Sequence, residues 1–175
     1  KKLNGILRQP IVKTASPCKS RHVLVRHVFA FACQARQSAR QGSGRDVYYS
    51  LCEWGRENPA TWAASIGASS WRVSNDISDN WKSIITRANI NAPLWRYART
   101  AYLGGWNDPD MLEVGNGGCS VVEYTSHYSL WAVMKAPLIL GMDLATVTLD
   151  SEIYSIISNK EVIAVNQDTA GLQAR

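Results

Sequence analysis

The chain has 175 residues, of which 46% are hydrophobic and 19% charged, a composition typical of a soluble globular protein with its own core. No apolar run approaches the 18 or more residues needed to cross a bilayer, so we expect no membrane-spanning segment. The net charge of +5 averages two unlike parts, since residues 1–45 hold ten Lys and Arg and no acid, whereas residues 46–175 hold nine basic and fourteen acidic residues. The sequence therefore predicts a basic leader, residues 1–45, without defined structure, ahead of an ordered part, residues 46–175.

The basic leader leaves three interpretations open: an organellar transit segment, an arm that binds nucleic acid or a membrane surface, or foreign sequence ahead of a domain. Its only aromatic residues are Phe29 and Phe31, within one apolar run, so it lacks the interleaved aromatics of a single-strand-binding surface. We therefore expect neither nucleic acid nor a membrane as a partner of this chain.

The four cysteines and three histidines do not form a metal-binding pattern. No two cysteines have the C-x-x-C spacing, and no histidine lies beside them in a zinc pattern. We expect no metal and no cofactor. An even number of cysteines permits two disulfides, but the spacing does not require them.

The ordered part begins after a glycine-rich turn at residues 41–45. A run of β-branched and aromatic residues predicts a strand over 47–52. A proline at a first-turn position predicts a helix over 59–67, with Asn58 as its cap and a glycine as its stop.

The next two elements form a second strand and helix pair. A short strand is predicted over 70–73, and a helix follows over about 79–89. Apolar residues recur at helical spacing in this helix and leave Lys82 and Arg87 pointing outward.

The rest of the chain continues the same alternation. Strands are predicted over 101–106 and 137–141, helices over 121–135 and 152–158, and an extended segment over 162–168. Strands that alternate with helices at this spacing indicate parallel βα units and an α/β fold.

Polar residues follow the predicted strands one after another. Active sites of α/β barrels are built at the C-terminal ends of the strands, so this placement favours a functional site over a purely structural use. The residues concerned are Glu53, Trp54, Asp76, Asp108, Asp110 and Asp143.

The loop over residues 104–118 combines two carboxylates with a proline, a tryptophan and several glycines. Pro109 disfavours helical geometry at Asp108 and fixes its own φ, so Asp108 and Asp110 project from a stiff backbone. Stiff carboxylates beside an aromatic suit a polyol such as a sugar, because the carboxylates accept from hydroxyls and the indole packs on a C–H face. The alternative is a tight turn with a capping Asp.

Four long motifs carry a resemblance to one family, the α-galactosidases of glycoside hydrolase family 27, which belong to the clan-D retaining glycosidases. The resemblance covers about residues 46–175 and is specific, since four long motifs in order seldom occur by chance. With Gly55 after CEW, the chain resembles the plant-type enzymes more than the animal ones. The motifs are YSLCEWG at 49–55, SWRVSNDISDNW at 70–81, GGWNDPDMLEVGNGG at 104–118 and NKEVIAVNQD at 159–168.

The resemblance implies the last four βα units of a (β/α)8 TIM barrel that cleaves terminal α-linked galactose with retention, with galactose and α-galactosides as partners. It implies that Asp76 is the acid/base. The residues that match sugar-binding positions are Arg72, Asp110, Met111, Cys52 and Trp54, with Glu53 as a further candidate although its neighbours make the sugar contacts in the plant-type pattern.

Two of these residues also have a structural interpretation. Asp76 could be the N-cap of the helix that begins near residue 79, and Cys52 could be a buried structural thiol. Asp108 is expected to brace its loop. Ala68 stands where animal relatives have the cysteine partner of Cys52, so the resemblance implies no disulfide there.

The chain also departs from the family. The family's nucleophile lies on the fourth barrel strand in a K-Y-D-x-C pattern, and this chain has no such pattern. We therefore predict a glycosidase fragment that is inactive alone and can self-associate through exposed sheet edges. The alternatives are a galactose-binding remnant without catalysis, or a protein whose basic arm is the functional part. The resemblance implies a secreted or vacuolar/lysosomal location.

Overall fold

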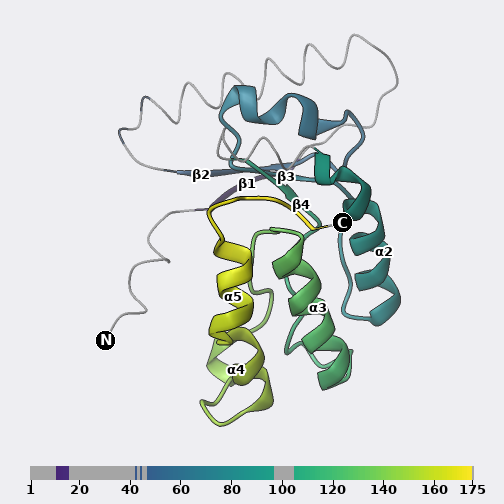
Figure 1. Ribbon diagram of the computed structural model, residues 1–175, viewed down its shortest axis with the longest axis vertical. Helices are drawn as coiled ribbons and strands as arrows, with labels where there is room; N and C mark the ends of the chain where they lie inside the picture. The colour runs from purple at the N-terminus through teal and green to yellow at the C-terminus, as the bar shows by residue number, and fades with distance from the viewer. Residues whose placement is uncertain (1–10, 16–41, 43, 45–46, 97–104, 175) are drawn as a thin grey trace.

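A parallel sheet lies between the α-helices on one side and two short 3-10 turns on the other (Figure 1). The computed structural model describes residues 11–15, 42, 44, 47–96 and 105–174, and for residues 11–15 it describes the backbone alone. The described strands pair in the order β1-β2-β3-β4, and each pair is parallel. They are β1 (Ile11–Ala15), β2 (Tyr48–Cys52), β3 (Ser70–Arg72) and β4 (Trp106–Asp108).

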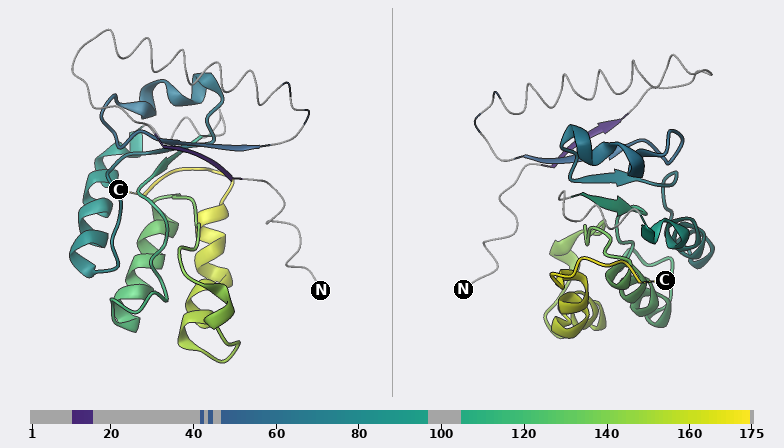
Figure 2. Two further views of the ribbon diagram at one scale, coloured as in Figure 1. Left: turned by 180° about the vertical axis from the view of Figure 1, so that it is seen from behind. Right: turned by 45° about the horizontal axis from the view of Figure 1, so that its top comes forward.

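Helical segments follow β2, β3 and β4 along the chain, which confirms the predicted alternation. Figures 1 and 2 show the two 3-10 turns after β2 on the side of the sheet opposite the later helices. The described helices are α2 (Trp81–Asn91), α3 (Val121–Val133), α4 (Glu152–Ile157) and α5 (Lys160–Gln167), and the 3-10 turns are η1 (Pro59–Thr61), η2 (Ala63–Ile66), η3 (Ala92–Arg96) and η5 (Leu144–Thr146).

β1 lies within the basic leader, for which no defined structure was expected. It pairs with β2 without interruption, from Ile11 opposite Tyr48 to Ala15 opposite Cys52. The β-branched residues of IVKTA suit a strand, but so short a run is a weak signal without a neighbouring strand. The expectation was wrong for these five residues, since the leader contributes a strand to the sheet.

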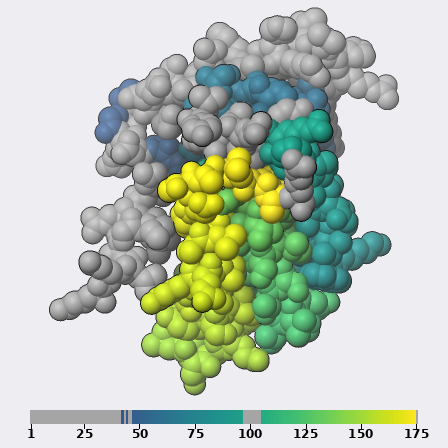
Figure 3. Space-filling model, viewed as in Figure 1, coloured from purple at the N-terminus to yellow at the C-terminus, as the bar shows by residue number. Residues whose placement is uncertain are grey.

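Two apolar clusters stabilise the described residues. Trp71 and Leu51 are fully buried in the first, between β2, β3 and the turns η1 and η2. Trp131 is fully buried in the second, which joins α2, α3 and α4, and Figure 3 shows these later helices packed side by side. Burying one large apolar side chain stabilises a fold by roughly 1.5–3 kcal/mol, so each cluster is a substantial part of the stability.

The segment after β2 is not the single helix that was predicted over 59–67. It forms η1 and η2, separated by Trp62, and Gly67 ends them with a φ of 73°. Asn58 does not cap with its side chain; it has a φ of 52°, and its carbonyl oxygen accepts from the Thr61 amide.

Side-chain caps fix where the two long helices begin. Asn80 accepts from the Ser83 amide at the start of α2, so Asp76 is not the cap that the structural interpretation allowed. Ser120 and Glu123 form a reciprocal capping box at the start of α3. Both helices match their predicted ranges within two residues.

The last βα unit differs most from the expectation. Instead of a buried strand over 137–141, the described chain has one parallel bridge between Leu112 and Leu140. Residues 137–140 are half-buried and Gly141 is exposed. The segment over 162–168 is not extended but belongs to α5, whose cap Asn159 accepts from the amides of Glu161 and Val162. The predicted strand over 101–106 lies mostly outside the described residues, and β4 begins at Trp106.

Candidate active site

The ends of two neighbouring strands converge on one group of charged side chains. Arg72 is the last residue of β3, and it lies opposite Asp108, the last residue of β4. Asp110 follows β4 by two residues, and Asp76 lies in the loop from β3 to α2. Because the strands are parallel, these residues collect at one edge of the sheet, as the barrel interpretation predicts.

Arg72 joins the two carboxylates. One of its terminal nitrogens lies 2.7 Å from Asp110 Oδ2 and 3.2 Å from Asp76 Oδ1. The Arg72 and Asp110 side chains are 9% and 7% exposed, whereas the Asp76 side chain is 69% exposed. The guanidinium thus holds one buried and one accessible carboxylate, and only the accessible one is free to meet a ligand.

Asp110 is the buried end of this arrangement, and both of its oxygens are occupied. Oδ1 accepts from the amide of Met111, and Oδ2 accepts from the amide of Ile77 as well as from Arg72. The backbone is held too, since Asp110 donates its amide to Asp108 Oδ1 at 2.8 Å, which agrees with the expected bracing role of Asp108. Asp110 has a φ of 107°, and this network keeps it in that rarely populated region.

α3 supports the same loop from behind. The Trp131 indole N–H donates to the backbone oxygen of Asp110 at 2.7 Å, and His127 Nε2 accepts from the Glu113 amide at 3.0 Å. The His127 and Trp131 rings pack edge to face, with centroids 4.1 Å apart. Burial lowers the pKa of His127 to about 4, so this ring is neutral at pH 7 and can accept at Nε2.

Cys52 and Trp54 lie beside the charged group. The pKa of the Cys52 thiol is raised, first by burial, and the charges of Asp76 and Asp110 add to this, while Arg72 and a hydrogen bond with the Trp54 side chain oppose it. Cys52 is free and half-buried, and Trp54 is 36% exposed. The thiol therefore lies within reach of the Arg72 charge, and the Trp54 side chain lies beside the thiol.

The turn after β2 sets the direction of Trp54. Trp54 has a φ of 65°, and the Gly55 amide donates to the Arg72 carbonyl at 3.1 Å. A Cβ at Gly55 would lie 2.3 Å from the Val73 carbonyl oxygen, so only glycine allows the turn to approach β3 this closely. The guanidinium of Arg56 stacks on the Trp54 ring, 5.0 Å from its centroid.

Glu53 does not join this group; its side chain is directed into the turn that follows it. The residue is 7% exposed, and Oε1 accepts from the Glu57 amide at 2.6 Å. Trp62 holds the same turn by donating its indole N–H to the Glu57 carbonyl. Glu53 is the first residue after β2, and its hydrogen bond to the Glu57 amide directs the carboxylate into the following turn. Met111 is half-buried, and its amide donates to Asp110.

We expect Glu53 to make stability depend on pH. Burial raises its pKa to about 7 from 4.5, so the folded chain holds this proton more tightly than the unfolded chain does. The stabilisation from this group is complete below pH 4.5 and is lost as the pH rises to 7. Urea unfolding at several pH values should show the wild type losing up to about 1.4 kcal/mol per pH unit relative to Glu53→Gln across this window.

The comparison with Glu53→Gln isolates the titration of this residue. The amide does not titrate, and its oxygen can still accept from Glu57. Because the pKa of His127 is lowered, its contribution to stability is lost as the pH falls from 6.5 to about 4, which is the opposite trend to that of Glu53. The wild type and Glu53→Gln share this contribution, so it cancels in the comparison. A stability difference that stays constant between pH 4.5 and 7 would contradict the prediction.

Sequence reasoning missed two kinds of residue at this site. Arg87 was expected to point outward, but its guanidinium donates to the carbonyl oxygens of Asn75 and Asp76. Trp131 and His127 lie in the helix predicted over 121–135, and no link between them and Asp110 was predicted. A helical side chain leans toward the N-terminus of its helix, and this was the available signal that Arg87 could reach the preceding loop.

Within the described ranges, no group of three or more His, Cys, Asp and Glu side chains is placed to hold a metal ion. Across the same residues, no helix has both the length and the apolar character needed to cross a membrane.

Parallel βα units with charged residues at the strand ends define part of a (β/α)8 barrel of the glycosidase class. Comparison with known proteins specifies the family. The sequence model described as Alpha galactosidase A matches residues 27–168, and the chain belongs to this family, glycoside hydrolase family 27. The matched region begins inside the basic leader.

The relatives cover most of this chain, but the chain covers only part of them. α-Galactosidase 2 of Arabidopsis thaliana is 56% identical over 133 residues, which are 76% of this chain and 32% of the relative. The crystal structure of α-galactosidase I from Mortierella vinacea matches with a TM-score of 0.75 and 40% identity over 82% of this chain and 40% of that one. α-Galactosidase from Saccharomyces cerevisiae with raffinose matches with a TM-score of 0.69 and 33% identity, covering 83% and 36% of the two chains. The chain spans about a third of the length of the curated relatives it matches.

Proposed function

We propose that residues 46–175 supply the acid/base half of a retaining α-galactosidase site, which binds terminal α-galactosyl groups and is not catalytically competent with the residues of this chain alone. The observation that carries the proposal is the guanidinium of Arg72 between an exposed and a buried carboxylate, Asp76 and Asp110. Cys52 and Trp54 lie beside this group, where the thiol and the indole ring can contact a sugar. The family membership and the relative with raffinose support galactosides as substrates.

Asp76 suits the role of proton donor and acceptor. Its side chain is exposed and accepts a hydrogen bond from Arg72, so an oxygen can reach the glycosidic atom of a bound substrate. A retaining enzyme needs a second carboxylate roughly 5 to 5.5 Å away that attacks the anomeric carbon. Asp110 is close enough to be considered, since it contacts the same Arg72 nitrogen.

Asp110 is nevertheless a poor nucleophile. Its side chain is 7% exposed, and both oxygens already accept hydrogen bonds from backbone amides. A carboxylate so occupied holds a loop or a hydroxyl group better than it attacks carbon. The strand beside β2 does not supply a replacement, because β1 has the sequence IVKTA and residues 1–45 contain no acid. The covalent intermediate of a retaining mechanism therefore needs a carboxylate from outside these residues.

The experiment uses purified residues 1–175, with an aryl α-galactoside as substrate. We expect no turnover by the chain alone, and turnover after a separately expressed first half-barrel of a plant-type relative is added. Asp76→Asn should abolish this turnover. Turnover by the chain alone that is lost on Asp76→Asn would reveal a nucleophile within these residues and overturn the proposed incompetence.

A binding role without catalysis is the second candidate, because Arg72, Asp110 and Trp54 could hold a sugar without a nucleophile. Retention on a galactose-affinity column without turnover in any mixture would select this role. Arg72→Met should abolish the retention, whereas Lys82→Met, at an exposed position on α2, should leave it unchanged. Self-association through β1, the outermost of the described strands, would appear as a concentration-dependent mass in analytical ultracentrifugation.

A further inference from the structure

We propose that Arg87 is a positioning residue that fixes the direction of the Asp76 side chain by holding its peptide group. The proposal rests on the proposed acid/base role of Asp76 and adds a residue to that site. Asp76 needs such support because its carboxylate is 69% exposed. An exposed side chain on an unsupported loop would sample many directions, whereas proton transfer requires that the carboxylate keep a single direction.

The guanidinium of Arg87 binds the outer side of this loop. Nε donates to the Asn75 carbonyl oxygen at 3.0 Å, and a terminal nitrogen donates to the Asp76 carbonyl oxygen at 2.5 Å. Two donors of one planar group thus bind two successive carbonyls, which fixes both position and orientation. Arg87 belongs to α2, whose inner face is buried through Ile84 and Ala88. The guanidinium that binds the loop is therefore anchored on a rigid helix.

The inner side of the same peptide is held by a second charged group. The Ile77 amide, which belongs to the peptide that carries the Asp76 carbonyl, donates to Asp110 Oδ2 at 2.8 Å. A cation therefore binds the oxygen of this peptide while an anion binds its N–H. Without Arg87, the peptide could turn about the Asp110 contact and take the Asp76 side chain with it.

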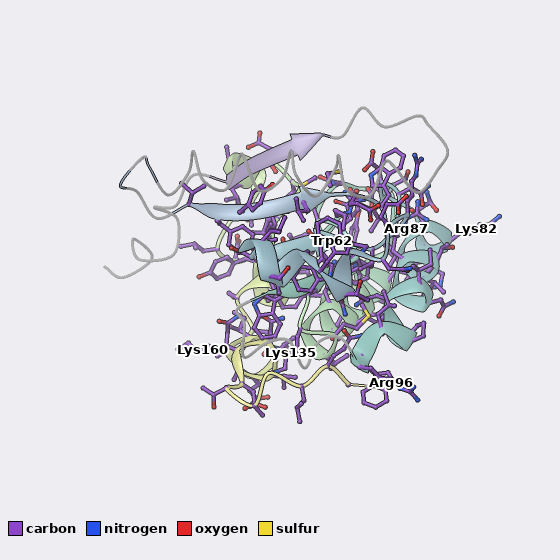
Figure 4. All side chains as sticks on the ribbon, turned by 90° about the horizontal axis from the view of Figure 1, so that it is seen from above. Trp62, Lys82, Arg87, Arg96, Lys135 and Lys160 are labelled. Atoms are coloured by element: carbon purple, nitrogen blue, oxygen red, sulfur yellow. The ribbon has the colours of Figure 1, made fainter. Side chains whose placement is uncertain are left out.

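Arg87 acts on the loop that carries the proposed acid and does not lie at the sugar-binding atoms. Within the part of the chain that the structure describes, its side chain donates to two backbone carbonyls of this loop. Lys82 is the matched control, since it is a cation on the same helix that projects away from the molecule (Figure 4). Arg87→Lys is the conservative variant, because an ammonium can reach one of the two carbonyls but cannot bind both in one plane.

The first measurement is amide hydrogen exchange of residues 1–175, followed residue by residue by NMR. Arg87→Ala should speed exchange at Ile77 by about tenfold or more, because a hydrogen bond to a charged group contributes that much protection. Arg87→Lys should show a smaller increase, and Lys82→Ala none. An unchanged Ile77 rate in Arg87→Ala overturns the proposal, and this result does not depend on catalysis.

The second measurement is turnover in the mixture with the first half-barrel. A misdirected acid matters most for a poor leaving group, so kcat/KM for methyl α-galactoside should fall about tenfold to a hundredfold in Arg87→Ala. With a dinitrophenyl α-galactoside, which leaves without a proton, kcat/KM should change less than about threefold. Equal losses on both substrates would assign Arg87 to general stability and overturn the positioning role.

A double variant separates this inference from the proposed function. If Arg87 acts through Asp76, Arg87→Ala should cause no further loss in an Asp76→Asn background. A wild-type mixture without turnover would overturn the proposed catalytic role, while the exchange rate at Ile77 would still decide whether Arg87 holds the loop.

Discussion

Asp76→Asn is expected to lower kcat of the complemented enzyme by about 10² to 10⁴-fold, the range that general acid/base catalysis contributes. The amide cannot give or take the proton, yet it retains the size of the carboxylate and can still accept from Arg72. Galactose binding should therefore fall much less than turnover. Steady-state kinetics with an aryl α-galactoside gives the first quantity, and titration calorimetry with galactose gives the second.

The stability of the same variant serves as its control. Asp76 is mostly exposed, and an exposed ion pair contributes about 0–1 kcal/mol, so urea unfolding should change little. Loss of turnover together with a large loss of stability would mean that the residue is structural. Full turnover in Asp76→Asn would remove it from the acid/base role.

In contrast to Asp76→Asn, Asp110→Asn should mainly lower stability and should destabilise the chain by about 3–5 kcal/mol. The substitution leaves Arg72, which is 8% exposed, without its nearest anion and gives the Ile77 amide a weaker acceptor. Asn tolerates a positive φ, so backbone strain at this position is not the cause of the loss. Urea unfolding of residues 1–175 measures the difference from the wild type.

Asp76→Asn and Asp110→Asn form a matched pair, because each removes one charge from the same guanidinium. The buried partner should dominate stability and the exposed partner should dominate turnover. Similar unfolding free energies for the two variants would show that burial of Asp110 does not control the strength of its ion pair with Arg72.

The sequence was sufficient for the elements whose signals agreed at every level. β3 and α2 were predicted because the strand run, the helical periodicity and the family motif all coincide there. α5 was missed because Val162 and its β-branched neighbours favour a strand. Local propensity does not include the packing of this segment on α3. In the structure, Asn159 caps the helix, and Asn166 donates to the Ala136 carbonyl at 3.0 Å.

The site shows the same division. Motifs predicted that Arg72, Asp76 and Asp110 would come together, and the ion pairs join all three. Glu53 follows the last residue of β2, and its carboxylate accepts from the Glu57 amide in the next turn, a local contact that the motif does not record. Arg87 was missed because helical periodicity records which face a residue occupies but not how far a long side chain reaches.

The left-handed backbone of Asp110 affects how a ligand would meet this loop. Trp131 holds the Asp110 carbonyl, and Asp108 holds its amide, so contacts within the protein fix this unusual conformation. The entropy of ordering the loop is lost during folding and not when a sugar arrives. Association should therefore cost little loop entropy, and galactose should bind with almost the same loop conformation that the free chain has.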